Sequence, residues 1–83
     1  MQITFPLIST IDSSTGMVAF PADVGGTRLR CLVSTEALQD HCQGIGVDPV
    51  EAFEANRDRI ELIASEKINS GQTGTILIKT ADF

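Results

Sequence analysis

The stretch VAFPADVGGTRLRCLV, residues 18–33, decides the fold of this 83-residue chain. Two runs of strand-forming residues flank Gly25 and Gly26, which give the backbone freedom that a tight hairpin turn requires. In the second run apolar and polar residues alternate, which predicts a half-buried strand with Arg28 and Arg30 on its outer face. The core-facing residues of that strand are then Leu29, Cys31 and Val33.

Ahead of this hairpin, residues 3–6 and residues 18–21 are two short strand-like runs that each end in Phe-Pro. Because proline cannot donate a hydrogen bond to a neighbouring strand, we expect both runs to end, or to lie at a sheet edge, near Pro6 and Pro21. Between them, residues 12–16 are dense in turn-forming residues and predict a reversal of the chain.

After the hairpin the periodicity changes to that of helices. Ser34 can cap a short helix that runs to about Cys42, with Leu38 on its inner side. The strongest signal follows in residues 48–51, Asp-Pro-Val-Glu, which match a helix cap with proline at the first helical position. Apolar residues at spacings of three and four then predict one helix that runs to about Asn69.

The outer face of this second helix is expected to be charged and solvated. Arg57 and Arg59 lie among acidic residues at the spacings of helical ion pairs. Leu62 is an apolar exception on that face and is therefore a candidate contact residue. Asn56 lies beside the apolar stripe, and we expect its amide to bond nearby backbone.

Residues 74–80 return to strand composition, and their Ile-Leu-Ile run predicts an inner strand. The expected fold is therefore α+β: an antiparallel sheet of about four strands packed against two helices, in the order strands, helix, helix, strand. Neither a linker nor an internal repeat interrupts this pattern, so we expect a single small domain over residues 1–83.

Composition indicates which kinds of partner the protein can bind and where in the cell it is located. Eleven acidic residues against six lysines and arginines give a net charge of -5, which disfavours binding to nucleic acid and to anionic membranes. No apolar run approaches the length that spans a bilayer, and the first residues lack the pattern of a signal peptide. Two cysteines are too few for a secreted disulfide framework. We therefore expect a cytoplasmic protein, and the glycine patterns indicate no cofactor.

Several short motifs resemble a known family. They are Cys-Leu-Val-Ser-Thr-Glu-Ala-Leu at residues 31–38, Asp-Pro-Val-Glu-Ala-Phe at residues 48–53, and the terminal Thr-Ala-Asp-Phe at residues 80–83. On these motifs the chain resembles family 1488 of the bacterial domains of unknown function, over nearly all of its length. The resemblance implies a small bacterial α+β domain and brings no catalytic residues with it.

The only histidine of the chain and both of its cysteines lie within residues 31–42, which makes this stretch the candidate for catalysis. Cys31 and His41 are the candidates for a small thiol- and histidine-dependent enzyme, with Asp40 as a possible third member, because a thiolate needs a nearby base that a third group orients. His41 and Cys42 are neighbours on a helix, so their side chains diverge by about 100°. A zinc site would need four ligands, and the spacing does not match that of structural zinc sites, so no metal is expected.

The remaining candidates are surfaces. Arg28 and Arg30, joined by Lys79 on a nearby strand, could form a weak site for anions or nucleic acid, although an ordinary solvated sheet face is the better explanation for them. Since no catalytic constellation is complete, the leading hypothesis is a non-enzymatic interaction or regulatory domain. It would self-associate, as a homodimer for example, or bind a protein partner, through a sheet edge or through a helix surface that includes Leu62.

Overall fold

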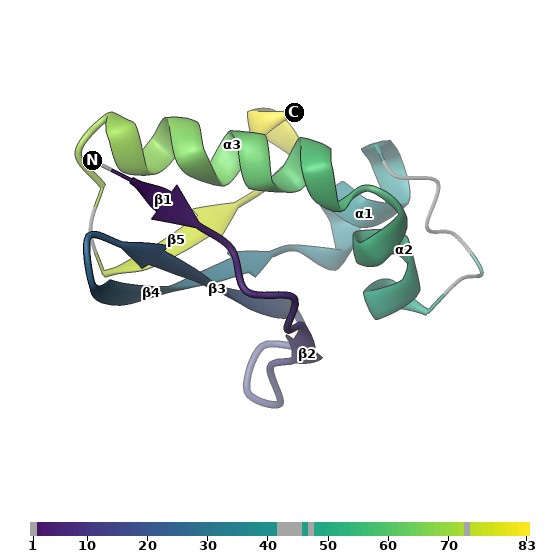
Figure 1. Cartoon of the computed structure of the whole chain (residues 1–83). Coiled ribbons are helices and arrows are strands. Elements are labelled where there is room, and N and C mark those ends of the chain that lie inside the picture. Colours follow the sequence, from purple (N-terminus) through teal and green to yellow (C-terminus); the bar gives the residue numbers. More distant parts are fainter. Residues whose placement is uncertain (1, 42–45, 47, 73) are drawn as a thin grey trace.

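One sheet and one layer of helices make up the computed structural model, which describes residues 2–41, 46, 48–72 and 74–83 (Figure 1). The strands are β1 (Ile3–Thr4), β2 (Thr10–Ile11), β3 (Val18–Val24), β4 (Thr27–Val33) and β5 (Thr75–Ile78). The helices are α1 (Thr35–His41), α2 (Pro49–Ala55), α3 (Arg57–Asn69) and a final 3-10 turn, η1 (Thr80–Asp82). The helices cover one face of the sheet and leave the other face open.

The central hairpin forms as its sequence predicts. β3 and β4 pair in antiparallel fashion from the Val18–Val33 pair to the Val24–Thr27 pair. Gly25 and Gly26 make the turn with φ angles of 56° and 89°. Both angles lie in the left-handed region that glycine tolerates, and this is the turn that matches the twist of a hairpin.

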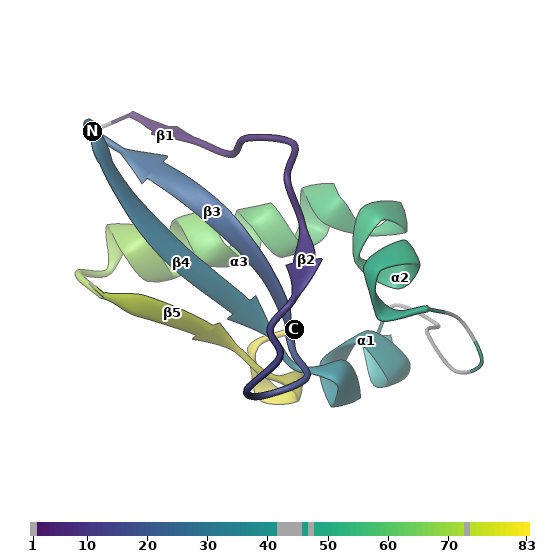
Figure 2. The same cartoon turned by 90° about the horizontal axis from the view of Figure 1, so that it is seen from below.

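The α+β class is confirmed, whereas two details of the sheet differ from expectation. The strand order is β1-β3-β4-β5, with β2 also paired to β3, and β5 runs parallel to β4 (Figure 2). The sheet is therefore mixed and not purely antiparallel, and the expected inner strand lies at an edge. The reason is the connection, because α3 carries the chain back over the sheet to the end where β4 begins.

The core lies between the helices and the inner face of the sheet. The Phe20 ring on β3 packs on the Phe53 ring of α2, with 4.9 Å between the ring centroids. Cys31 on β4 is fully buried in the same cluster, as the strand alternation predicts. The short first helix is also confirmed: the Ser34 side chain accepts a hydrogen bond from the Ala37 N–H, and Leu38 is buried.

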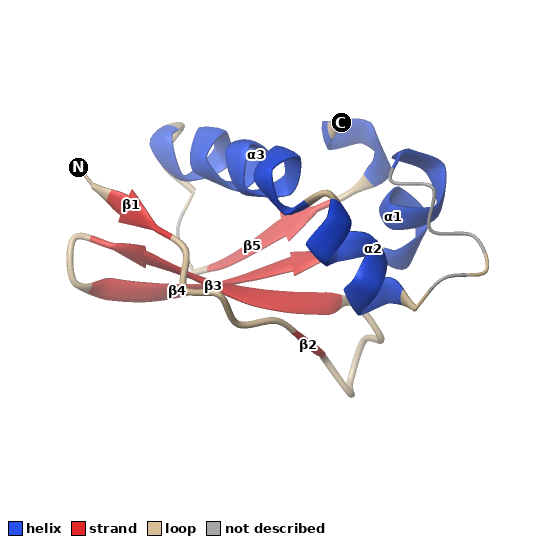
Figure 3. Cartoon of the chain, turned by 45° about the vertical axis from the view of Figure 1, so that its right-hand side comes forward, coloured by secondary structure: helices blue, strands red, loops and turns tan. Residues whose placement is uncertain are grey.

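The second predicted helix is two helices. Asp48 caps α2 by accepting a hydrogen bond from the Val50 N–H at 2.9 Å, but the helical path breaks at Asn56, where φ is -123° and ψ is 21°. The Asn56 side chain donates to the Ala52 carbonyl, which confirms the expected bond to nearby backbone. Asparagine often competes with helical hydrogen bonding in this way, and the break lets α2 and α3 point in different directions (Figure 3).

Candidate interaction site

The edge of the sheet beside β3 carries a bulge. β1 pairs with the far end of β3 through Thr4 and Asp23, and β2 pairs with its beginning through Thr10 and Ala19. Residues 5–9 of the N-terminal segment therefore span the same stretch of edge as residues 20–22 of β3. The N-terminal segment has two residues more than its partner, and this excess forces it outward. We call residues 5–9 the edge bulge.

Pro21 occupies the gap that the edge bulge leaves in the sheet. Gly25 donates to the Gln2 carbonyl and Met17 accepts from the Asp12 N–H, so the odd-numbered residues of β3 direct their backbone groups toward this edge. Pro21 is the odd-numbered residue opposite the bulge, and it has no N–H that could be left without a partner. Proline thus tolerates the gap without ending β3, so Pro21 lies at an edge while the strand continues.

The edge bulge holds two large apolar side chains in solvent. Leu7 is 87% exposed and Ile8 is 54% exposed. The Ile8 N–H donates to the Pro6 carbonyl at 2.8 Å, which closes a three-residue turn and leaves Leu7 at its tip. The turn makes Leu7 the most exposed of the large apolar residues that the structure describes.

A buried arginine fixes the edge bulge from behind. Arg57, only 7% exposed, donates to the Pro6 carbonyl at 2.5 Å, to Glu61 at 2.6 Å and to Glu54 at 2.9 Å. Ser9 also donates to Glu54, at 2.8 Å. The backbone before Leu7 and the side chain after Ile8 are therefore both bonded to the helical layer. The expectation of a fully solvated charged face is wrong for Arg57, because the bulge covers it.

A groove of about 330 Å³ lies between the edge bulge and the open face of the sheet. Its lining includes Ile8 and Thr10 on the bulge side, and Ala19, Pro21, Arg28 and Arg30 on the sheet side. The groove is shallow and is lined mainly by apolar atoms, with guanidinium groups at its rim.

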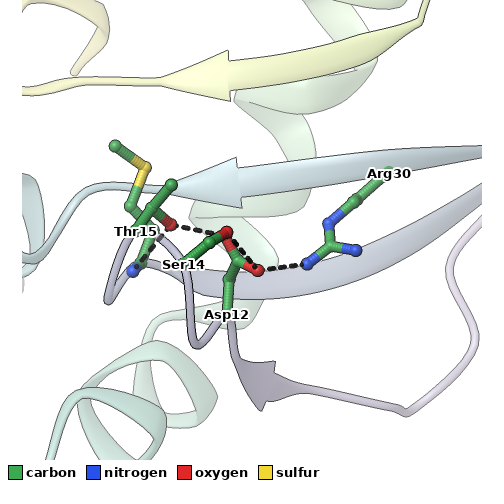
Figure 4. A network of polar contacts seen from close by, with 5 residues as sticks. Asp12, Ser14, Thr15 and Arg30 are labelled. Carbon is green, nitrogen blue, oxygen red and sulfur yellow. Dashed lines mark hydrogen bonds and ion pairs between the residues drawn. The ribbon is translucent and has the colours of Figure 1, made fainter.

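Each of the rim arginines has an aspartate beside it. Arg28 bonds Asp23 at 2.8 Å, and Arg30 bonds Asp12 at 2.8 Å across the open face (Figure 4). Asp12 also accepts from the hydroxyl of Thr15 at 2.6 Å, and this hydrogen bond is the main reason that the pKa of Asp12 is lowered. The arginines therefore add little net charge to the groove.

The charge of the chain is divided unequally between its two halves. Residues 1–33 contain two aspartates and two arginines, so the net charge of -5 is carried entirely by residues 34–83. Residues 1–33 build the edge bulge and strands β1 to β4, whereas residues 34–83 build the helices and β5, a strand without charged residues. The open face and its edge are consequently neutral, and the helical layer is acidic.

The candidate enzyme residues lie on different elements and differ in burial. Cys31 is fully buried on β4, and burial raises the pKa of its thiol to about 12. Asp40 is exposed on α1, and His41 is the last residue of that helix. The His41 side chain and Cys42 lie outside the described part of the chain. A cleft shared by Cys31 and His41 would involve that side chain and therefore also lies outside it. Within the described part of the chain, no three His, Cys, Asp or Glu residues are close enough to hold a metal ion.

The candidate surface residues fall into separate places. Arg28 and Arg30 are neighbours on the open face, opposite Asp23 and Pro21. Lys79 follows β5 four residues beyond the level of Arg30, which corresponds to about 13 Å along the strand. Leu62 is 61% exposed on α3, on the helical side of the molecule.

Reasoning from the sequence did not identify Leu7, Ile8 and Arg57 as a unit. The signal was weak: two apolar residues follow Pro6, and a second proline occurs in the next strand-like run. Leu7 is forced outward because β1 and β2 both pair with the same edge of β3, and only the structure shows this pairing. The burial of Arg57 depends on Pro6, which is 51 positions away in the chain.

Comparison with known proteins adds the family. Among the helices of the described residues, none has the length and apolar character needed to cross a bilayer. No protein of curated function and no solved structure matches the chain significantly. A family model described as "Protein of unknown function (DUF1488)" matches residues 3–78, and the chain therefore belongs to this family, in agreement with its sequence motifs.

Proposed function

We propose that this chain is a non-enzymatic interaction domain that self-associates. The observation that carries the proposal is the edge bulge, where Leu7 is 87% exposed although the residues beside it are bonded to the helical layer. Exposing a leucine to water forgoes about 1.5–3 kcal/mol of burial free energy. A fixed turn with an exposed apolar tip is suited to packing against another polypeptide.

The burial of Cys31 supports a non-catalytic role for this cysteine. A thiol enzyme uses the thiolate, and with a pKa of about 12 only about one Cys31 thiol in 10⁵ is ionised at pH 7. A buried free cysteine packs as a small apolar residue and is compatible with a reducing, cytoplasmic environment.

Multi-angle light scattering tests the proposal. The molar mass of the full chain, measured over a concentration series after size-exclusion chromatography, should rise from that of a monomer toward twice that value. A monomer mass at every concentration would contradict the proposal. Raising the salt concentration in the same series shows whether the acidic helical layer opposes association, because salt screens repulsion between like charges.

A further inference from the structure

We infer that the partner is a second copy of this chain docked on the open face of the sheet, with Leu7 of each copy seated in the groove of the other. The inference rests on the proposed function and names the surface and the geometry that it uses. Three properties of the described residues carry it: the distribution of charge, the distribution of exposed apolar side chains, and the position of the groove beside Leu7.

The charge distribution selects the sheet side of the molecule. Two copies with a net charge of -5 repel each other, and the repulsion is strongest where their acidic surfaces meet. All of the excess acid lies in residues 34–83, so contact between two helical layers would place like charges together. The open face instead offers Asp12 and Asp23 already paired with arginines. A like-charged copy can approach this neutral surface with the least repulsion.

Most of the exposed large apolar side chains belong to the sheet or to its bulged edge, and not to the helical layer. Five large apolar residues are exposed in the described chain, and only Leu62 belongs to the helical layer. Leu77 lies on the open face beside Leu32, since the two residues are partners in the parallel β4–β5 pair. The others belong to the bulged edge and are Leu7, Ile8 and Ile11.

The groove and the exposed leucine make this surface self-complementary. In a two-fold dimer each surface meets an identical surface, so a projection on one copy must find a hollow on the other. Leu7 is the projection, and the groove between Ile8 and Pro21 is the adjacent hollow. A two-fold axis beside the bulge would bring each Leu7 to the partner's groove and form the contact twice.

The size of a stable interface determines how far the contact extends. Such an interface covers about 800 Å² on each partner, which is about one sixth of the 4766 Å² surface of this chain. It takes about 20–30 residues from each partner, more than the edge bulge contains. The contact therefore extends from the bulge across the open face, where Pro21, Arg28 and Leu77 lie.

Sedimentation equilibrium of the full chain and of two matched variants tests the inference. Leu7→Ser and Leu62→Ser each remove one exposed leucine, the first from the bulge and the second from the helical layer. Because the Leu7 contact forms twice in the dimer, Leu7→Ser should weaken dimerisation by at least about a hundredfold. Leu62→Ser should leave the dissociation constant unchanged within a factor of about two. Circular dichroism should show that both variants remain folded, since neither side chain belongs to the core.

The possible outcomes separate the inference from the proposed function. A monomeric wild-type chain would overturn both. A wild-type dimer that tolerates Leu7→Ser but dissociates with Leu62→Ser would overturn the inference and leave the proposed function intact. A variant with Thr10→Glu places a carboxylate at an exposed position of the groove without changing Leu7, and it should also weaken the dimer. If Thr10→Glu leaves the dimer as strong as in the wild type, the groove is not the seat of Leu7 and the inference is wrong.

Discussion

Replacing Arg57 by alanine should destabilise this protein much more than the same change at Arg59, two residues further along α3. Arg57 is buried and bonded to Pro6, Glu54 and Glu61, and its guanidinium lies 5.0 Å from the centre of the Phe53 ring. Arg59 is exposed, and its guanidinium lies 5.0 Å from the centre of the Phe83 ring. The two substitutions remove the same side chain from one helix, so they differ mainly in how deeply that side chain is buried.

The expected cost follows from what Arg57→Ala leaves behind. Removing one partner of a buried ion pair costs about 3–5 kcal/mol, because the other charge remains without compensation. In this protein the side chains of Glu61 and Glu54 retain 20% and 46% of their exposure, so water solvates them in part. We therefore expect a loss of about 2–3 kcal/mol in the free energy of unfolding. This corresponds to a decrease of about 10–20 °C in Tm for a domain of this size.

Urea denaturation followed by circular dichroism measures this loss. Arg57→Ala should lower the midpoint without changing the slope, whereas Arg59→Ala should cost about 1 kcal/mol or less, the value of an exposed cation-π contact. Arg57→Lys should fall between them, because a compact ammonium group keeps the charge but lacks the extended planar set of donors with which a guanidinium reaches all three partners. Amide exchange at Ile8 should also accelerate in Arg57→Ala, since its N–H bonds the same Pro6 carbonyl. Equal losses for the alanine variants at 57 and 59 would refute the inference that the buried bonds of Arg57 stabilise the fold.

Three further predictions concern Asp12, Cys31 and the hairpin turn. The lowered pKa of Asp12, caused first by its bond from Thr15, means that its contribution to stability is complete above the unfolded pKa of about 3.9 and is lost as pH falls through the folded pKa. Asp12→Asn should therefore be less stable than the wild type at pH 7, and the difference should shrink toward pH 3; an equal difference at both pH values would argue against the network. In a Cys42→Ala background, Cys31 should react with a thiol reagent at pH 7.5 only after unfolding, and rapid labelling of the folded chain would show that its thiol is accessible. Gly26→Ala should cost about 1 kcal/mol in urea denaturation because φ at residue 26 is 89°, and no loss would mean that the turn relaxes to another conformation.

The elements of the fold could be predicted because their signals are local. The hairpin around Gly25, the short helix capped at Ser34 and the helix start at Asp48 each depend on residues within a few positions of one another. The family also could be identified from such short motifs, and it matches residues 3–78. The break at Asn56 was missed because the apolar spacing continues across it, although the backbone leaves the helical region there.

The candidate site depends on relations between distant segments. Leu7 is an ordinary apolar residue in the sequence, and it is exposed because β1 and β2 pair with two parts of β3 in registers that differ by two residues. Arg57 carries the spacing of a surface ion pair, and it is buried because the edge bulge lies over it. Neither fact is encoded in a window of neighbouring residues.

The sequence by itself determined the central hairpin, the helix starts after Ser34 and at Asp48, which face of β4 is buried, and that Cys31 belongs to the core. Hydrophobic periodicity and capping decide these features, since both act between residues that are close in the chain. The tertiary structure decided the parallel direction of β5, the two-residue excess that exposes Leu7, and the bonds from Arg57 that hold it in place. These depend on register and packing between segments far apart in sequence, where a shift of one residue reverses which side chains meet solvent.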